Sequence, residues 1–155
     1  MPTRRILKLA DASHHLEIVA GWNHAEWGAG QGYSLQDSVD WFRDIMRKPS
    51  EECMIAIEGA AVVGMASLVD HDLDSRPDLL HWLASVYVVP EQRGKGIAAT
   101  LVAALEREAT LRSIPLLHLY THNSEALYAK LGWTLHEHFM RGTGRFALMT
   151  KKPAL

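Results

Sequence analysis

The sequence has little cysteine, little net charge and no long apolar run. Cys53 is its single cysteine, so no disulfide can form within the chain, which is typical of proteins in the reducing cytoplasm. The formal net charge at pH 7 is -2, which gives no electrostatic reason to expect nucleic acid or an anionic membrane as a partner. No apolar run approaches the ~20 residues of a membrane-spanning helix, and residues 1–7 lack the apolar centre of a signal peptide. We therefore expect a cytoplasmic protein that binds neither nucleic acid nor membrane.

The chain of 155 residues is long enough to bury a core and has the size of one domain, which we expect to span residues 1–155. Alternating and continuous apolar runs predict strands, and apolar residues at helical spacing predict helices. Ser13 and Ser34 precede two of the helices as favourable N-caps, and the glycines within 27–33 indicate a loop. The predicted strands are 5–9, 54–58, 62–69, 80–88, 116–120, 133–139 and 146–151, and the predicted helices are 13–22, 34–48, 96–112 and 124–130.

Residues 86–99 are the most informative part of the sequence. A β-branched apolar run ends at Pro90, a short loop follows, and a helical pattern then begins. The first amides of a helix lack internal partners, and the helix dipole favours an anion at the same place. The loop carries two glycines, which let a ligand approach the backbone, and two cations: Arg93, Gly94, Lys95 and Gly96. This order of strand, loop and helix predicts a binding site for a phosphate or diphosphate.

Three families of phosphate-binding loop are candidates. The P-loop requires a hydroxyl residue after its lysine, and Gly96 stands there instead. Residues 94–99 match the dinucleotide pattern Gly-x-Gly-x-x-Gly/Ala, but residues 116–120 hold no acid for the ribose, which argues against a nucleotide-dependent oxidoreductase. Residues 93–98 match Arg/Gln-x-x-Gly-x-Gly/Ala, the acyl-CoA loop of the GNAT superfamily of N-acetyltransferases, which the chain resembles over nearly its whole length.

A second motif carries the same resemblance. Residues 122–133 are similar to the family segment Asn-x-x-Ala-x-x-Leu-Tyr-x-Lys-x-Gly-Phe, and the match is close from Leu127 to Trp133. Gly132 stands where it can end a helix before the next strand. The spacing differs in the first half, because Tyr128 follows Asn123 by five positions where the family usually has seven.

The resemblance implies an α/β fold of the GNAT type: a mixed, mostly antiparallel central sheet of six to seven strands, flanked by about four helices, with a splayed strand pair at the acyl-CoA site. It implies direct transfer of an acetyl group from acetyl-CoA to a primary amine, on a small molecule or a peptide N-terminus. Tyr128 would then give a proton to the CoA thiolate. By the same resemblance, the cofactor would be bound by Val86, Tyr87, Val88, Arg93, Gly94, Lys95, Gly96, Ile97, Ala98, Ala99 and Asn123.

The sequence gives fewer indications of the acceptor amine and of the general base. In the family that the chain resembles, the first two helices close the acceptor site, which makes Trp22 and Trp27 candidates for contact with the acceptor. Many relatives carry a glutamate that acts as the general base at the position of Trp82, and His81 lies beside that position. Other candidates for the base are His71, His118, His122 and Glu125. The acids of residues 70–78, next to aromatic residues, would attract a cationic amine. They lack the glycine and the final glutamate of a calcium loop, so we expect no metal site.

A second reading from another functional class is a non-catalytic domain that senses acyl-CoA or regulates a partner. The missing strand glutamate favours that reading, and the complete segment around Tyr128 favours an enzyme. A homodimer is compatible with either reading.

Overall fold

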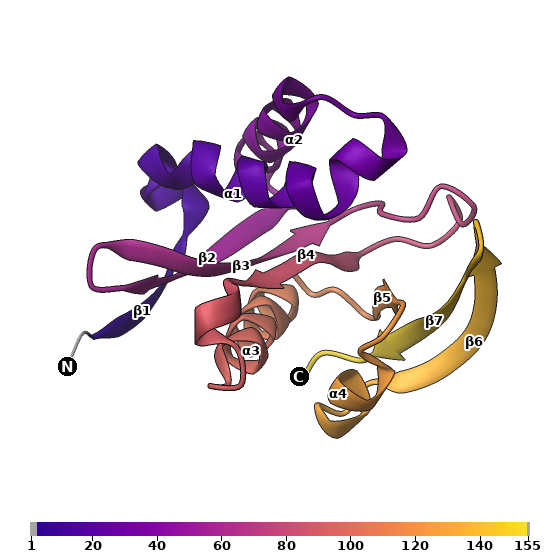
Figure 1. Ribbon diagram of the computed structural model, residues 1–155. Helices are drawn as coiled ribbons and strands as arrows, with labels where there is room; N and C mark the ends of the chain where they lie inside the picture. Colours follow the sequence, from indigo (N-terminus) through magenta and orange to yellow (C-terminus); the bar gives the residue numbers. More distant parts are fainter. Residues whose placement is uncertain (1–2, 155) are drawn as a thin grey trace.

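A single sheet of seven strands carries helices on both faces in the computed structural model of the protein, which describes residues 3–154 (Figure 1). Its strands lie in the order β1-β2-β3-β4-β5-β7-β6, and each neighbouring pair in the described chain is antiparallel except β4 with β5. The predicted mixed, mostly antiparallel sheet is therefore confirmed. The strands are β1 (Arg4–Lys8), β2 (Glu52–Glu58), β3 (Ala61–Val69), β4 (Trp82–Val88), β5 (Leu117–Thr121), β6 (Thr134–Arg141) and β7 (Gly144–Lys151). The α-helices are α1 (Leu16–Asn23), α2 (Leu35–Arg47), α3 (Ile97–Leu111) and α4 (Glu125–Lys130).

The start of α2 follows directly from its sequence, whereas the start of α1 does not. The Ser34 hydroxyl accepts from the Asp37 amide, and the Asp37 carboxylate accepts from the Ser34 amide, which makes a complete capping box. Ser13 caps nothing, because residues 13–15 form a 3₁₀ turn that leads into α1.

The prediction of a loop over residues 27–33 is largely wrong. After α1 the chain continues as a π-helical turn, His24–Gly28, and a 3₁₀ turn, Ala29–Gln31, and it leaves helical geometry only at Gly32, whose φ is +83°. His24 Nε2 lies 3.0 Å from the Tyr33 carbonyl oxygen and so closes this segment on itself. Glycine tolerates a helix when the surrounding segment is helical, so Gly28 and Gly30 did not break it.

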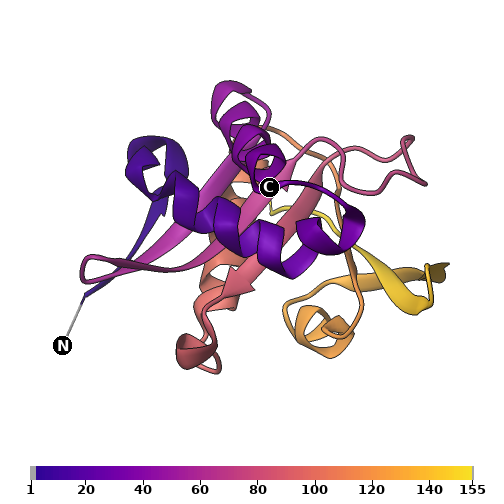
Figure 2. The same ribbon diagram turned by 45° about the horizontal axis from the view of Figure 1, so that its top comes forward.

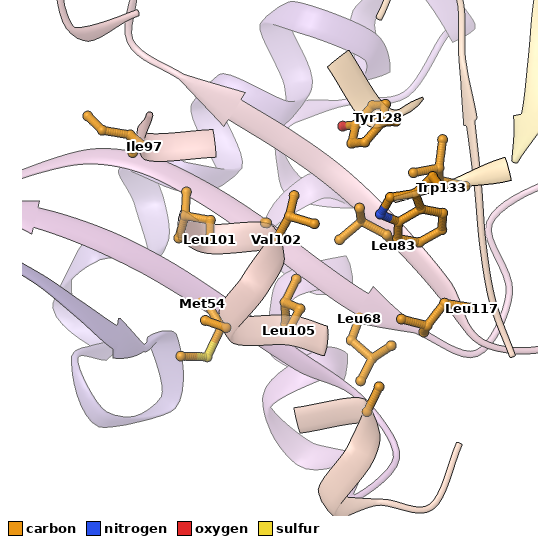
Figure 3. Close-up of a cluster of buried hydrophobic side chains, with 14 of the residues drawn as sticks. Met54, Leu68, Leu83, Ile97, Leu101, Val102, Leu105, Leu117, Tyr128 and Trp133 are labelled. Atoms are coloured by element: carbon orange, nitrogen blue, oxygen red, sulfur yellow. The ribbon is translucent and has the colours of Figure 1, made fainter. Parts of the chain in front are cut away.

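Two apolar layers cover the two faces of the sheet. Helices α1 and α2 cover one face of the sheet (Figures 1 and 2). On this face, Phe42 and Ile45 pack with Met65 and Trp82. On the α3 face, Ile97, Leu101 and Leu105 of α3 pack on the strands, and Tyr128 and Trp133 extend the same layer toward α4 (Figure 3). Alternation along β4 sends Leu83 to the α3 face and Ala84 to the α1/α2 face, as the two-residue period of a strand requires.

The sheet changes character between β4 and β5. These strands pair at one position only, Trp82 with His118. Farther along, β4 carries a bulge: Ala84 pairs with Ser67 and Tyr87 with Met65, so β4 has one more residue than β3 in the same interval. A bulge bends its strand and leaves a residue out of the ladder. The predicted splayed strand pair is thus present at β4 and β5.

Candidate active site

The loop between β4 and α3 has the geometry of an anion-binding turn. Gly94 and Gly96 have φ angles of +78° and +79°, which glycine adopts without a steric penalty. Gly96 is the N-cap of α3 and offers no side chain to the first amides of the helix. Neither the Gly94 amide nor the Gly96 amide donates a hydrogen bond within residues 3–154. The loop therefore presents unpaired donors at the positive end of a 15-residue helix.

The two cations of this loop are already engaged with the protein. Arg93 Nε donates to the Val88 carbonyl at 2.9 Å, and the guanidinium carbon lies 5.4 Å from the centre of the Tyr87 ring. Lys95 Nζ donates to Gln92 Oε1 at 3.0 Å. Arg93 thus fixes the strand to the loop as well as contributing charge, whereas exposed Lys95 can exchange its partner for an anion.

A cleft of about 820 Å³ opens between the splayed strands. Its walls include Leu83, Val86 and Leu119 from the α3 face, and Ala84 and Tyr120 from the α1/α2 face. Because residues of both faces line it, the cleft passes through the sheet where β4 and β5 separate. Its volume lies in the range of small-molecule sites.

Tyr128 lines this cleft from α4. The residue is 7% exposed, and its ring packs edge-on against Trp133 with the centroids 6.2 Å apart. In Figure 3 its hydroxyl oxygen points away from Trp133. Burial raises the pKa of the Tyr128 hydroxyl to about 12, so the group keeps its proton throughout the neutral range.

The opposite side of the cleft is acidic and aromatic. Its acids come from the segment after α1, from α2 and from the β3–β4 loop, and its aromatic residues come from the same helical layer: Glu26, Asp37, Asp72, Asp74, Trp27, Tyr33 and Trp41. Arg141 of β6 also lines this side, and its guanidinium carbon lies 5.4 Å from the centre of the Tyr120 ring. The Tyr120 hydroxyl donates to the Asp72 carbonyl at 3.4 Å.

Asp72 has the most unusual electrostatic environment in the β3–β4 loop. Burial is the main cause that raises the pKa of its carboxyl to about 8; the Arg141 charge opposes this rise, and the Asp74 charge adds to it. Burial also raises the pKa of Tyr120 to about 12, with the Asp72 charge adding to that effect. An arriving cation would lower the energy of the charged Asp72 carboxylate.

A polar chain of three side chains crosses the bend of β4. Asn23 at the end of α1 donates from Nδ2 to Ser38 Oγ at 3.2 Å, and its Oδ1 accepts from Ser85 Oγ at 3.0 Å. Ser85 belongs to the β4 bulge and has a φ of +54°, which is uncommon for any residue with a side chain. All three residues line the cleft.

The residues predicted for binding fall into three groups. Val86, Asn123 and Trp27 line the cleft together with Tyr128. Residues 93–99 form the glycine loop and the first turn of α3, outside the cleft wall. Tyr87 and Trp22 pack against each other with ring centres 5.2 Å apart, and neither lines the cleft; Val88 is buried on the α3 face.

His81 lies away from the cleft. It lines a separate hollow beside Pro49, Arg112 and Ile114. Its φ of +74° keeps His81 out of β4, so the strand begins at Trp82 and not at Leu80 as predicted. Trp82 is fully buried, and its indole donates to the Leu79 carbonyl at 3.0 Å. No proton acceptor therefore stands at the strand position where many relatives would carry a glutamate.

Two of the other four candidates for the base line the cleft, and two do not. His71 and His122 line the cleft. His118 is buried with Nδ1 3.0 Å from the Leu80 carbonyl oxygen, and Glu125 is paired with His138 Nε2 at 2.8 Å. Neither of those two reaches the cleft.

A family model described as the acetyltransferase (GNAT) family matches residues 16–133. The chain belongs to this family. No curated protein sequence matches the chain. The family and the computed fold agree, because the matched region runs from α1 to the residue before β6 and so contains the glycine loop, the splayed strands and Tyr128.

Solved structures share the GNAT fold at low sequence identity. An aminoglycoside 6'-N-acetyltransferase in complex with coenzyme A has a TM-score of 0.78 at 15% identity, covering 97% of this chain and 98% of its own. A spermidine N-acetyltransferase chimera from Vibrio cholerae and hSSAT has a TM-score of 0.69 at 18% identity, covering 97% of this chain and 95% of its own. An acetyltransferase-like protein from Salmonella typhimurium, solved with acetyl-CoA, has a TM-score of 0.72 at 20% identity, covering 100% and 95%.

Sequence reasoning missed several residues that line the cleft. Counting seven positions back from Tyr128 leads to Thr121, and its Oγ1 accepts from the Ser124 amide at 3.1 Å, just before α4. The seven-residue spacing of the family motif could have identified it. Asn23, Ser38 and Ser85 gave no comparable signal, because their link depends on a bulge that alternation does not reveal.

Proposed function

We propose that this GNAT protein transfers an acetyl group directly from acetyl-CoA to a primary amine on a cationic acceptor, a small molecule or a peptide N-terminus. The observation that carries the proposal is a single cleft between β4 and β5 with Tyr128 on one side and acids with aromatic residues on the other. The glycine loop lies at the end of the same strand, β4.

The cofactor would bind along the α3 side. The unpaired amides of the glycine loop would hold the diphosphate, since backbone donors at a helix N-terminus favour a negative group. The pantetheine arm would then run beside Val86 toward the cleft. A thioester oxygen there would gain charge in the transition state and be stabilised by backbone donors of β4.

The reaction needs two proton movements besides the bond changes. The neutral amine nitrogen forms a bond to the thioester carbon and loses a proton to water in the cleft, while the carbon–sulfur bond breaks and the sulfur gains a proton. A thiol has an ordinary pKa of about 8.5. With the pKa of Tyr128 at about 12, full transfer of its proton to the thiolate is uphill by about 3.5 pKa units, or about 5 kcal/mol. In this proposal Tyr128 stabilises the leaving sulfur mainly as a hydrogen-bond donor, and the transfer is completed as the product leaves.

The acceptor would enter from the α1/α2 side. The carboxylates there would attract a cation, and the Trp27 and Tyr33 rings offer faces for an ammonium group. The relatives of similar fold named for aminoglycoside and spermidine acetylation act on amines of this cationic kind. Their names support the class of acceptor and not its identity.

The test combines binding with turnover. Coenzyme A and acetyl-CoA at about 100 times their dissociation constant should stabilise the native protein by about 2.7 kcal/mol, and nicotinamide nucleotides should not. A thiol-release assay with acetyl-CoA should then show turnover with polyamines, amino sugars or peptides, and less with neutral aromatic amines. Stabilisation without turnover on any amine would favour the acyl-CoA sensor, and no stabilisation by either CoA species would refute the proposal.

A further inference from the structure

The bulge in β4 holds a serine in a backbone conformation that side chains rarely adopt. Ser85 has a φ of +54° in the middle of β4, between Ala84, which pairs with Ser67, and Tyr87, which pairs with Met65. Such a conformation is costly, so it persists only where the surroundings fix it. Residues held in this way concentrate at functional sites, and Ser85 lines the cleft between β4 and β5.

The side-chain amide of Asn23 is hydrogen-bonded to the Ser85 hydroxyl. Its Oδ1 accepts the Ser85 hydroxyl at 3.0 Å, and its Nδ2 donates to Ser38 Oγ at 3.2 Å. Ser38 is 3% exposed, so the Ser38 end of this series of hydrogen bonds is nearly buried. One amide thus joins α1, α2 and β4 at a single point.

Asn23 also stands where the helical layer changes its pitch. It is the last residue of α1, and the π-helical turn His24–Gly28 begins at the next residue. A side chain on Gly28 would come within 3.4 Å of Ser38 Oγ, so the π-helical turn also packs closely against the same hydroxyl. Single π turns are frequent at functional sites. The helical wall over the acceptor side and the bent strand on the cofactor side therefore meet at Asn23.

We propose that Asn23 is a positioning residue that holds the Ser85–Val86 bulge in the geometry needed for acyl transfer, and couples it to the helical wall of the acceptor side through Ser38. The inference rests on the proposed function, because it takes the acyl group to lie beside β4. Asn23 acts through Ser85 and not on the reacting atoms. Without the tie, the bulge can relax to a less strained backbone, and the β4 donors then point away from the thioester.

Three variants and one double variant test the coupling. Asn23→Ala and Ser85→Ala each remove one end of the same hydrogen bond, and the double variant removes both. Ser85→Gly removes the hydroxyl but adopts a positive φ freely, so it relieves strain while loosening the bulge. Gln36→Ala is the matched control, because it removes an amide hydrogen bond to Asp40 on an exposed part of α2 outside the cleft.

We expect kcat to fall about tenfold in Asn23→Ala, Ser85→Ala and Ser85→Gly, a loss in the range of one hydrogen bond. The double variant should be no slower than the slower single variant, since both changes break one link. The Gln36→Ala control should keep its kcat. Ser85→Gly should melt no lower than Ser85→Ala, and its kcat should still be about tenfold below that of the parent, a combination that a purely structural role does not produce. Unchanged kcat in the folded variants, or losses that multiply in the double variant, would overturn the inference.

Calorimetric binding of coenzyme A separates the failure of this inference from the failure of the proposed function. If the parent protein binds coenzyme A and Asn23→Ala binds it with the same affinity and the same kcat, the positioning role is wrong and the proposed function stands. If the parent protein does not bind coenzyme A, the proposed function is wrong and the inference is overturned with it.

Discussion

At the scale of single residues, Tyr128 lines the cleft, and burial raises the pKa of its hydroxyl to about 12. Replacing it with phenylalanine removes only the hydroxyl, so the ring should still pack on Trp133 and the melting temperature should change little. We expect Tyr128→Phe to bind coenzyme A like the parent and to lower kcat by about 10²-fold or more, the usual contribution of a positioned proton donor. Steady-state kinetics with calorimetry on the same samples measures both. An unchanged kcat would remove Tyr128 from the mechanism.

Asp72 makes a prediction about stability and pH. Its folded pKa of about 8 lies far above an ordinary aspartate value near 3.9, because burial disfavours the charge. Between pH 4 and pH 8 the folded state therefore binds more protons at this site than the unfolded state, so the contribution of Asp72 to stability is full below about pH 4 and is lost as pH rises to about 8. Asp72→Asn is neutral at every pH, so its melting temperature relative to the parent should rise across this interval.

Thermal melts of both proteins from pH 4 to pH 9 test this directly. A pH-independent difference for Asp72→Asn would mean that the carboxyl is charged in the folded state.

At the scale of elements, the most specific prediction concerns coenzyme A binding at the glycine loop before α3. Gly96 has a φ of +79° and no atom within 4 Å of an added Cβ, so a side chain there fits the fold but stands where the anion would approach. Gly142 in the β6–β7 turn has a φ of +62° and equally open surroundings. Gly96→Leu and Gly142→Leu should each lose about 1–2 kcal/mol of stability from the strained backbone. Only Gly96→Leu should lose coenzyme A binding, measured by calorimetry, and equal affinities in the two variants would place the diphosphate elsewhere.

Element types were largely predictable, and their ends were not. Periodicity identified α2 and α3 because each buries an apolar stripe, and continuous apolar runs identified the β2–β3 hairpin because both faces of these strands are buried. The helical stretch after α1 was missed because the surrounding layer overrides the glycines, and β4 begins late because His81 takes a positive φ that its residue type does not indicate. In the site, the glycine loop could be predicted because its function depends on residue type. The Asn23–Ser85 link could not, because it depends on strand register.

At the scale of the whole molecule, the split between β4 and β5 separates the two sides that the proposed function assigns to the cofactor and to the acceptor. The α3 face contributes Tyr128 and the glycine loop, and the α1/α2 face contributes the acids and aromatic rings. None of the helices in residues 3–154 is long and apolar enough to cross a membrane. Cytoplasmic location, the single domain over 1–155 and a homodimer stay predictions, as does the amine acceptor.

The most direct test of this account is a crystal structure of the protein with acetyl-CoA. We expect the diphosphate on the backbone amides of residues 94–98, the pantetheine arm beside Val86, and the thioester within hydrogen-bonding reach of the Tyr128 hydroxyl. A structure in which the ligand binds outside the space between β4 and β5, or leaves the amides of the glycine loop unpaired, would contradict it.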